Sequence, residues 1–175
     1  INSNLPQDIL IRWIKEVSIE FDARRSALLR RYDYLIQHYR PDVFLNGRAL
    51  FVYKKLDLVA MEKAAKHLIG ENDFSSFRAA SCQSNNPIRE MKSISFSEGN
   101  QLRVEFIANA YLHHMIRNIM GTLIDVGHGK IEVDKMKEIL DAKDRQMASK
   151  KVTAEGLYLF GVKYPDKYQL PTIDI

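Results

Sequence analysis

Residues 112–126 carry the strongest periodic pattern in the sequence, and this pattern limits the possible folds more than any other feature. Apolar side chains recur at every third or fourth position, which predicts an amphipathic helix that Gly127 and Gly129 end. The apolar stripe consists of Leu112, Met115, Ile116, Ile119, Met120, Leu123 and Ile124. The different, polar or small face consists of His114, Asn118, Gly121 and Asp125. So continuous a stripe requires another element to cover it.

Other segments show the alternation of apolar and polar residues that is typical of strands. They are residues 9–17, 31–39, 88–97, 101–109 and 157–164. The third and fourth are joined at Glu98-Gly99-Asn100, which is a hairpin signal. The last segment, LYLFGVKY, is so apolar that we expect a buried strand.

Two further helices are predicted, at residues 58–69 after the N-cap Asp57 and at residues 134–141. Residues 21–30 suggest a short helical turn, ENDFSSF a capped turn, and residues 78–87 a polar loop. Helices and strands are interspersed without a break in composition. We therefore expect one α+β domain over residues 1–175, with a mixed, largely antiparallel sheet and helices packed on one face.

Composition narrows the possible functions. The 175 residues include 26 basic and 22 acidic side chains, a net charge of +4 that permits a polyanionic partner. The single cysteine, Cys82, excludes an internal disulfide framework and a multi-cysteine zinc site. No apolar run approaches the roughly 18 residues that a membrane span needs, and no signal-peptide pattern is found.

Basic residues gather at positions 24–31 and 143–151, the first group next to Tyr32 and Tyr34. Guanidinium groups bind phosphate and aromatic rings stack on bases, so these segments could bind RNA. A solvated basic surface over packed tyrosines is the alternative. Motifs typical of nucleotide-binding loops or serine hydrolases do not occur.

Arg117 falls near the edge of the apolar stripe, where a charge requires a carboxylate or phosphate partner unless it reaches solvent. A weaker hypothesis is a metal-dependent hydrolase. Its ligands would be His113, His114, His128 and Asp125. Adjacent histidines point about 100° apart on a helix, which is poor geometry for one metal ion, so we expect none.

Six stretches coincide with one family, in order along the chain. They are NSNLPQDI, ARRSALLRRYDYLI, LIGENDFSSFRA, CQSNNPIREM, ANAYLHHMIRNIMGTLIDVG and AEGLYLFGVKYP. Together they resemble the tRNA pseudouridine synthases of the TruA type. The resemblance implies the pseudouridine synthase fold and isomerisation of uridine to pseudouridine in the anticodon arm of tRNA. It further implies no cofactor, no metal and a homodimer that binds tRNA. A tRNA substrate, the lack of targeting signals and the lone Cys82 together predict a cytoplasmic location.

The resemblance also implies roles for individual residues. Tyr32 would stack on the target base and serve as a base, and Arg117 would pair with the nucleophilic aspartate and help to flip the nucleotide. An apolar pocket residue would be Leu157 or Leu159, with Leu157 favoured. The full set expected to bind substrate is Tyr32, Arg117, Leu157, Arg24, Arg31, Arg78, His113 and Asn118.

The chain departs from the family at the nucleophile. The GRTDAG motif that carries this aspartate is missing, and by resemblance it would lie before Ile1. Asp22 and Arg25 stand where the family often has His and Phe, which affects local loop packing. We therefore expect a C-terminal catalytic-fold portion that is inactive alone. The alternative is a catalytically silent RNA-binding or assembly module.

Overall fold

The computed structural model describes residues 1–38 and 41–171. The strands are β1 (Leu29–His38), β2 (Leu50–Val52), β3 (Gly70–Asp73), β4 (Ile88–Glu98), β5 (Leu102–Ala108) and β6 (Leu157–Lys163). The helices are α1 (Leu58–Lys66), α2 (Met115–Gly127) and α3 (Lys135–Ala142). Short 3-10 turns span Asn2–Asn4, Val43–Leu45, Ser75–Phe77, Arg145–Met147 and Asp166–Tyr168.

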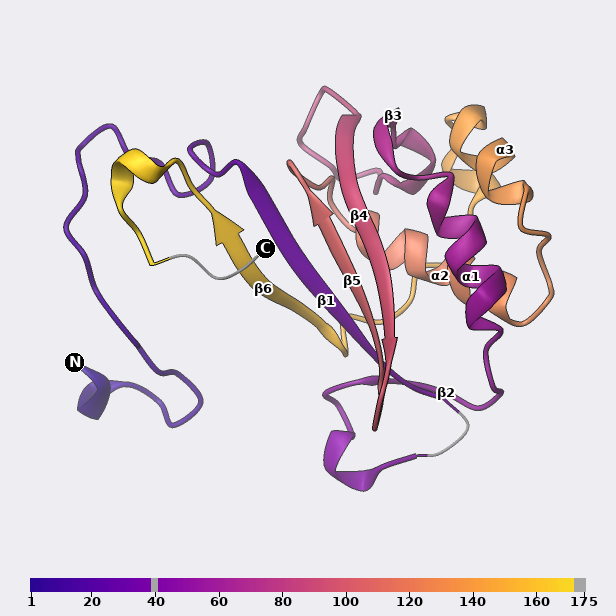
Figure 1. Ribbon diagram of the computed structural model, residues 1–175, viewed down its shortest axis with the longest axis horizontal. Coiled ribbons are helices and arrows are strands. Elements are labelled where there is room, and N and C mark those ends of the chain that lie inside the picture. Colours follow the sequence, from indigo (N-terminus) through magenta and orange to yellow (C-terminus); the bar gives the residue numbers. More distant parts are fainter. Residues whose placement is uncertain (39–40, 172–175) are drawn as a thin grey trace.

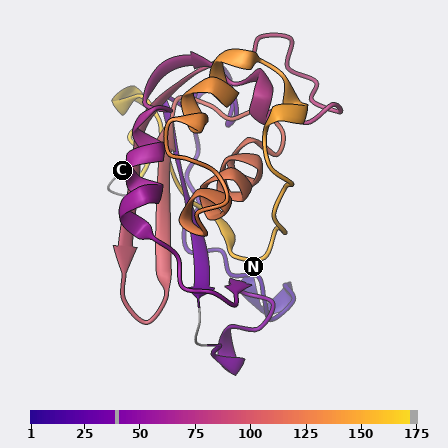
Figure 2. The ribbon, with the colours of Figure 1, turned by 90° about the vertical axis from the view of Figure 1, so that its right-hand side faces the viewer.

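The strands form one open sheet in the order β2-β1-β5-β4-β3, and β6 also pairs with β1. Only the short β1–β2 pairing is parallel, while the other pairings are antiparallel. All three α-helices lie on one face of this sheet (Figures 1 and 2). The predicted fold class is confirmed.

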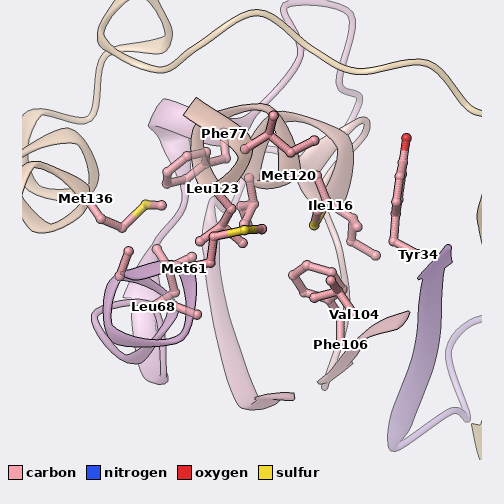
Figure 3. Close-up of a cluster of buried hydrophobic side chains, with 14 of the residues drawn as sticks. Tyr34, Met61, Leu68, Phe77, Val104, Phe106, Ile116, Met120, Leu123 and Met136 are labelled. Carbon is pink, nitrogen blue, oxygen red and sulfur yellow. The ribbon is translucent and has the colours of Figure 1, made fainter. Parts of the chain in front are cut away.

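The core lies between α2 and the faces of β1 and β5 that carry alternating apolar residues (Figure 3). Tyr34, Val104 and Phe106 on the strands are fully buried, as are Ile119 and Met120 on the helix. Each such side chain contributes about 1.5–3 kcal/mol on burial. The predicted apolar stripe is therefore the seam that joins helix and sheet.

The polar or small face of α2 is also covered. Asn118 is buried, and Gly121 packs directly against the backbone of residues 150–151, where a Cβ would overlap the Lys150 carbonyl oxygen. The basic stretch at 143–153 is thus a strap over α2. This packing brings Val152 to the first turn of the helix.

One edge of β1 pairs with β6 up to Tyr34 and with β2 from Ile36, and Gly156 lies between these two pairings. Its carbonyl accepts a hydrogen bond of 2.8 Å from Leu35 N–H, and its φ is +88°. A Cβ at this position would overlap the Leu35 carbonyl oxygen. Glycine is therefore required for the close approach of the two backbones, which fixes where Leu157 begins β6.

Four local predictions were wrong or incomplete. Residues 9–17 form no strand and pair with none among the described residues, and Trp13 is 53% exposed. Residues 21–30 form only turns before β1 begins at Leu29. ENDFSSF supplies strand β3 as well as a 3-10 turn. β6 is an edge strand with Leu159 55% exposed, because on its outer side no described strand covers it.

The remaining predicted elements occur with shifted ends. α1 begins after Asp57, whose carboxylate accepts a hydrogen bond from Ala60 N–H, and β4 and β5 form the expected hairpin. α2 begins at Met115, three residues later than predicted, because His114 has a φ of +63°. Residue 39 of the predicted strand 31–39 lies outside the described residues. No helix in the described part of the chain is long and apolar enough to cross a bilayer.

Candidate active-site pocket

A cavity of about 900 Å³ opens between the start of β1, the loop at 81–84, the N-terminus of α2 and the start of β6. It brings together five of the residues expected from the resemblance: Arg24, Tyr32, His113, Arg117 and Leu157. Its lining within the described chain contains five arginines and two histidines but no carboxylate. The cavity is therefore strongly cationic and suited to an anionic ligand.

Tyr32 is presented to the cavity by β1, on the same face as the buried Tyr34. Its ring meets the Tyr111 ring edge to face, with centroids 5.1 Å apart. The Tyr111 hydroxyl donates to the backbone carbonyl of Arg30 over 3.2 Å, and burial raises the pKa of Tyr111 well above its usual value. Tyr111 is thus a neutral, anchored wall behind the Tyr32 ring.

Arg117 lies on the first turn of α2, at the edge of the core. Its Nε donates to the Val152 carbonyl over 2.8 Å, and its Nη1 lies 3.5 Å from His114 Nδ1. Within residues 1–38 and 41–171 it contacts no carboxylate, so the anionic partner expected from the sequence is not supplied here. The strap therefore holds the guanidinium in place at the cavity without neutralising it.

His114 supports this arrangement at some conformational cost. A left-handed backbone costs a non-glycine residue about 1–2 kcal/mol, and such strain is often found at functional sites. Partial burial lowers the pKa of His114, and the electrostatic influence of His113, Lys151 and Arg117 lowers it further. A neutral imidazole can accept a hydrogen bond from Arg117, whereas a protonated one would repel it.

The rim of the cavity is built by the turn before β1. Asp22 accepts hydrogen bonds from the N–H groups of Arg24 and Arg25, which lower the pKa of its carboxyl. The Arg30 guanidinium binds the carbonyls of Ala27, Arg24 and Asn109. Asp22 therefore stabilises a turn that places two exposed arginines at the cavity.

Cys82 lines the cavity from the loop that follows Arg78. Its partial burial raises the pKa of the thiol, but hydrogen bonds from the N–H groups of His113 and Ser84 and the nearby Arg78 guanidinium outweigh this, so the pKa is lowered. His113 N lies 3.4 Å from Cys82 Sγ. The cavity thus favours negative charge even on a thiol.

Three residues expected to bind substrate lie elsewhere. Arg31 points away from the cavity lining: it pairs with Asp33 at 2.9 Å and Glu105 at 2.7 Å, and packs over the Phe160 ring. Asn118 is 1% exposed and its side chain bonds the Phe77 carbonyl and Arg145. These contacts give Arg31 and Asn118 structural positions.

Arg78, the third, lies beside the cavity without lining it and donates to the Cys82 carbonyl over 3.1 Å. Of the two leucines left open by the sequence, Leu157 lines the cavity and Leu159 does not. The structure adds Arg30, Arg89 and Tyr111, which sequence reasoning did not assign to the site. All three lie in stretches that carry the family resemblance, and Arg30 also belongs to the basic run, but nothing in these patterns distinguished their side chains from their neighbours.

The metal-hydrolase hypothesis was wrong. Its four residues divide between the two ends of α2, with His113 and His114 before the helix and Asp125 and His128 near its end. A helix of this length separates its ends by about 20 Å. In the described ranges no group of three or more His, Cys, Asp or Glu side chains is placed to hold a metal ion.

Comparison with known proteins gives a consistent result. The family model for tRNA pseudouridine synthase matches residues 64–165. The tRNA pseudouridine synthase A of Yersinia pestis is 47% identical over 176 residues, covering 99% of this chain and 66% of the relative. Those of Pectobacterium atrosepticum and Vibrio parahaemolyticus are 48% and 45% identical, covering 98% and 99% of this chain and 61% and 67% of the relative.

The chain thus spans about two thirds of the length of these relatives. The match to the family model covers more than half of the chain and includes the helix that carries Arg117 and the strand that begins at Leu157. Both elements line the cavity. The chain therefore belongs to the tRNA pseudouridine synthase family.

Proposed function

We propose that this chain forms the substrate pocket of an enzyme that isomerises uridine to pseudouridine in the anticodon arm of tRNA. The observation that carries the proposal is the convergence of Tyr32, Arg117 and Leu157 on one cationic cavity. Relatives that share nearly half of the sequence are named tRNA pseudouridine synthase A, which supports the same assignment.

The cavity provides what a flipped nucleotide needs. Removing a base from its stack costs a few kcal/mol, and an aromatic face together with a cation in the vacated space can offset that cost. Tyr32 presents its ring between Tyr111 and the open cavity, and Leu157 supplies an apolar wall. Arg117 is held by Val152 and carries an uncompensated charge at the same cavity.

The reaction is an isomerisation in which every atom of uridine is retained. The bond between the ribose C1′ and the uracil N1 breaks, the uracil turns, and C1′ bonds to C5. The proton on C5 must then leave and a proton must arrive on N1. In our proposal Tyr32 accepts the C5 proton, since its ring lines the cavity and its hydroxyl has no hydrogen-bond partner among the described residues.

A nucleophilic carboxylate is the component that the described cavity lacks. We propose that it is an aspartate from the portion of the relatives that this chain does not cover, and that Arg117 pairs with it. A neighbouring guanidinium lowers the pKa of a carboxyl and keeps it ionised for attack. The absence of any carboxylate from the described lining supports this division of the site.

The test is formation of pseudouridine in an unmodified tRNA transcript, detected by mass spectrometry after nuclease digestion. The protein at the full length of its relatives should convert anticodon-arm uridine, with no added metal or cofactor, and the 175-residue chain alone should not. Turnover by the chain alone would contradict the external nucleophile. Binding without turnover at full length would instead favour a silent RNA-binding module.

We further propose that the enzyme is a cytoplasmic homodimer. Large apolar side chains are exposed along residues 9–19, including Leu10 at 69% and Ile14 at 67%, and a protein contact would cover them. Sedimentation velocity at full length would show a dimer in the predicted case and a monomer otherwise. Cell fractionation would test the location.

A further inference from the structure

We propose that Arg89, together with the rim residues Arg24 and Arg25, binds a backbone phosphate of the RNA next to the nucleotide that enters at Tyr32. This inference rests on the proposed function, because it assumes an RNA substrate in the cavity. In this arrangement, the part of the cavity lined by Arg24, Arg25 and Arg89 binds the RNA backbone, and the part lined by Tyr32 binds the base.

Arg89 is fixed before any ligand arrives. Its Nη1 donates to the carbonyls of Asn86 and Ile88 over 2.9 and 2.5 Å, and its Nη2 donates to Ser84 Oγ over 2.9 Å. Its Nε is buried and has no hydrogen-bond partner in the described chain. All three acceptors are neutral, so the guanidinium is held in one orientation while its charge is uncompensated.

The surroundings of Arg89 are cationic. Partial burial lowers the pKa of Arg89, and the positive charges of Arg78 and Arg30 lower it further, with only the Cys82 thiol acting in the opposite sense. The adjacent Glu90 pairs with Lys92 instead. Positive charges that lie close together without a carboxylate repel one another, and a bound anion would relieve this repulsion. The cluster around Arg89 therefore favours binding of an anion.

The register of the sheet places this cluster beside Tyr32. Arg30 lies on the same face of β1 as Tyr32, two residues before it, so the two Cα atoms are about 7 Å apart. Arg30 is paired with Ala108, and Ala108 is paired with Met91, two residues from Arg89 on β4. Tyr32 and Arg89 line the same cavity, so a strand of RNA whose base reaches Tyr32 can place a nearby phosphate at Arg89.

Phosphate is the anion that this geometry fits best. Arg89 supplies a fixed positive charge, because its Nη1 and Nη2 already donate within the loop and its Nε is buried. The guanidiniums of Arg24 and Arg25 can supply the fork that binds two phosphate oxygens at once. Arg24 and Arg25 are exposed, and their backbones are fixed by Asp22. They can follow the phosphate without any change in the fold.

The experiment measures the affinity of the full-length protein for a fluorescent tRNA anticodon stem-loop over a range of salt concentrations. R89Q should weaken binding about tenfold and reduce the slope of log affinity against log salt by about 0.7–0.9, the value for one lost phosphate contact. R89K should retain the slope, because an ammonium keeps the charge, and should lose part of the affinity, because it cannot reproduce the three hydrogen bonds that fix the guanidinium. R24Q/R25Q should also reduce the slope.

R103Q is the matched control, because Arg103 lies on β5 and its nearest acid is Asp33, in the ion network that also holds Arg31. It should bind with the wild-type slope. A wild-type slope and affinity in both R89Q and R24Q/R25Q would overturn the inference, and the exposed pair still tests it if R89Q fails to fold. Failure of the wild-type protein to form pseudouridine would overturn the proposed function instead.

Discussion

The rings of Tyr32 and Tyr111 meet edge to face, with their planes 84° apart. Tyr32 faces the cavity from β1, and Tyr111 is anchored by its hydroxyl to the carbonyl of Arg30 on the same strand. The two residues thus form one rigid unit on the start of β1. An aromatic base that stacks on Tyr32 would meet a ring whose tilt is already set.

The first prediction tests this unit. Tyr111→Leu should lower kcat for pseudouridine formation about tenfold, since an aromatic pair contributes about 0.5–1.5 kcal/mol beyond burial. KM should change little, because the cations that hold the RNA remain. Tyr111→Phe keeps the ring and loses only the hydroxyl anchor, so its kcat should fall much less than that of Tyr111→Leu. An equal fall of kcat in both variants would contradict the role of the ring.

The second prediction concerns Arg117. Arg117→Ala should reduce turnover by about 10²-fold or more, as expected for loss of a charge at the reacting centre. It should lower the free energy of unfolding by only about 1 kcal/mol, the contribution of its hydrogen bond to the Val152 carbonyl. Turnover assays and urea unfolding measure the two losses. Equal losses in the two would indicate that the residue is merely structural.

The third prediction uses Leu157 and Leu159 as a matched pair on one strand. Leu157→Ala should weaken turnover because this side chain lines the cavity, whereas Leu159→Ala should leave it unchanged because Leu159 is exposed outside the lining. Steady-state kinetics on the same tRNA transcript decide between them. A greater effect of Leu159→Ala would reverse the assignment of the pocket wall.

The fourth prediction follows from the lowered pKa of Cys82. A lowered pKa means that the thiolate accumulates at a lower pH, so the rate of alkylation by iodoacetamide should rise with a midpoint below the ordinary value of about 8.5. Mass spectrometry of the peptide that contains Cys82 follows the reaction. The anticodon stem-loop should protect the thiol, and an ordinary midpoint or no protection would contradict this picture of the cavity.

Periodicity predicted the fold wherever a segment meets its partner within the chain. The α2 stripe and the β4–β5 hairpin are paired with neighbours in the same sheet or core, so their apolar pattern is matched by burial. Residues 9–17 show the same alternation, but no described strand lies beside them. Apolar alternation shows that a segment could be buried in a sheet. Only the structure shows whether another strand lies beside it.

The site was predicted less completely, for a physical reason. Tyr32, Arg117 and Leu157 belong to recognisable stretches, and the fold brings them to one cavity. Arg31 and Asn118 lie in those stretches too, but their side chains are taken up by the sheet and the core. Whether a side chain faces the cavity depends on the register of the strands and on how the strap packs over α2. Neither can be inferred from the position of a residue within a recognisable stretch.

The backbone contact between Leu35 and Gly156 determines where the pocket wall at Leu157 stands, and the side chain at position 157 determines its chemistry. Since main-chain atoms of Leu35 and Gly156 set the start of β6, the wall stands where it does whatever side chain occupies position 157. The side chain at position 157 can therefore be replaced, and the space in the cavity enlarged or reduced, without rebuilding the sheet. Glycine at position 156 is what makes this independence of wall and sheet possible.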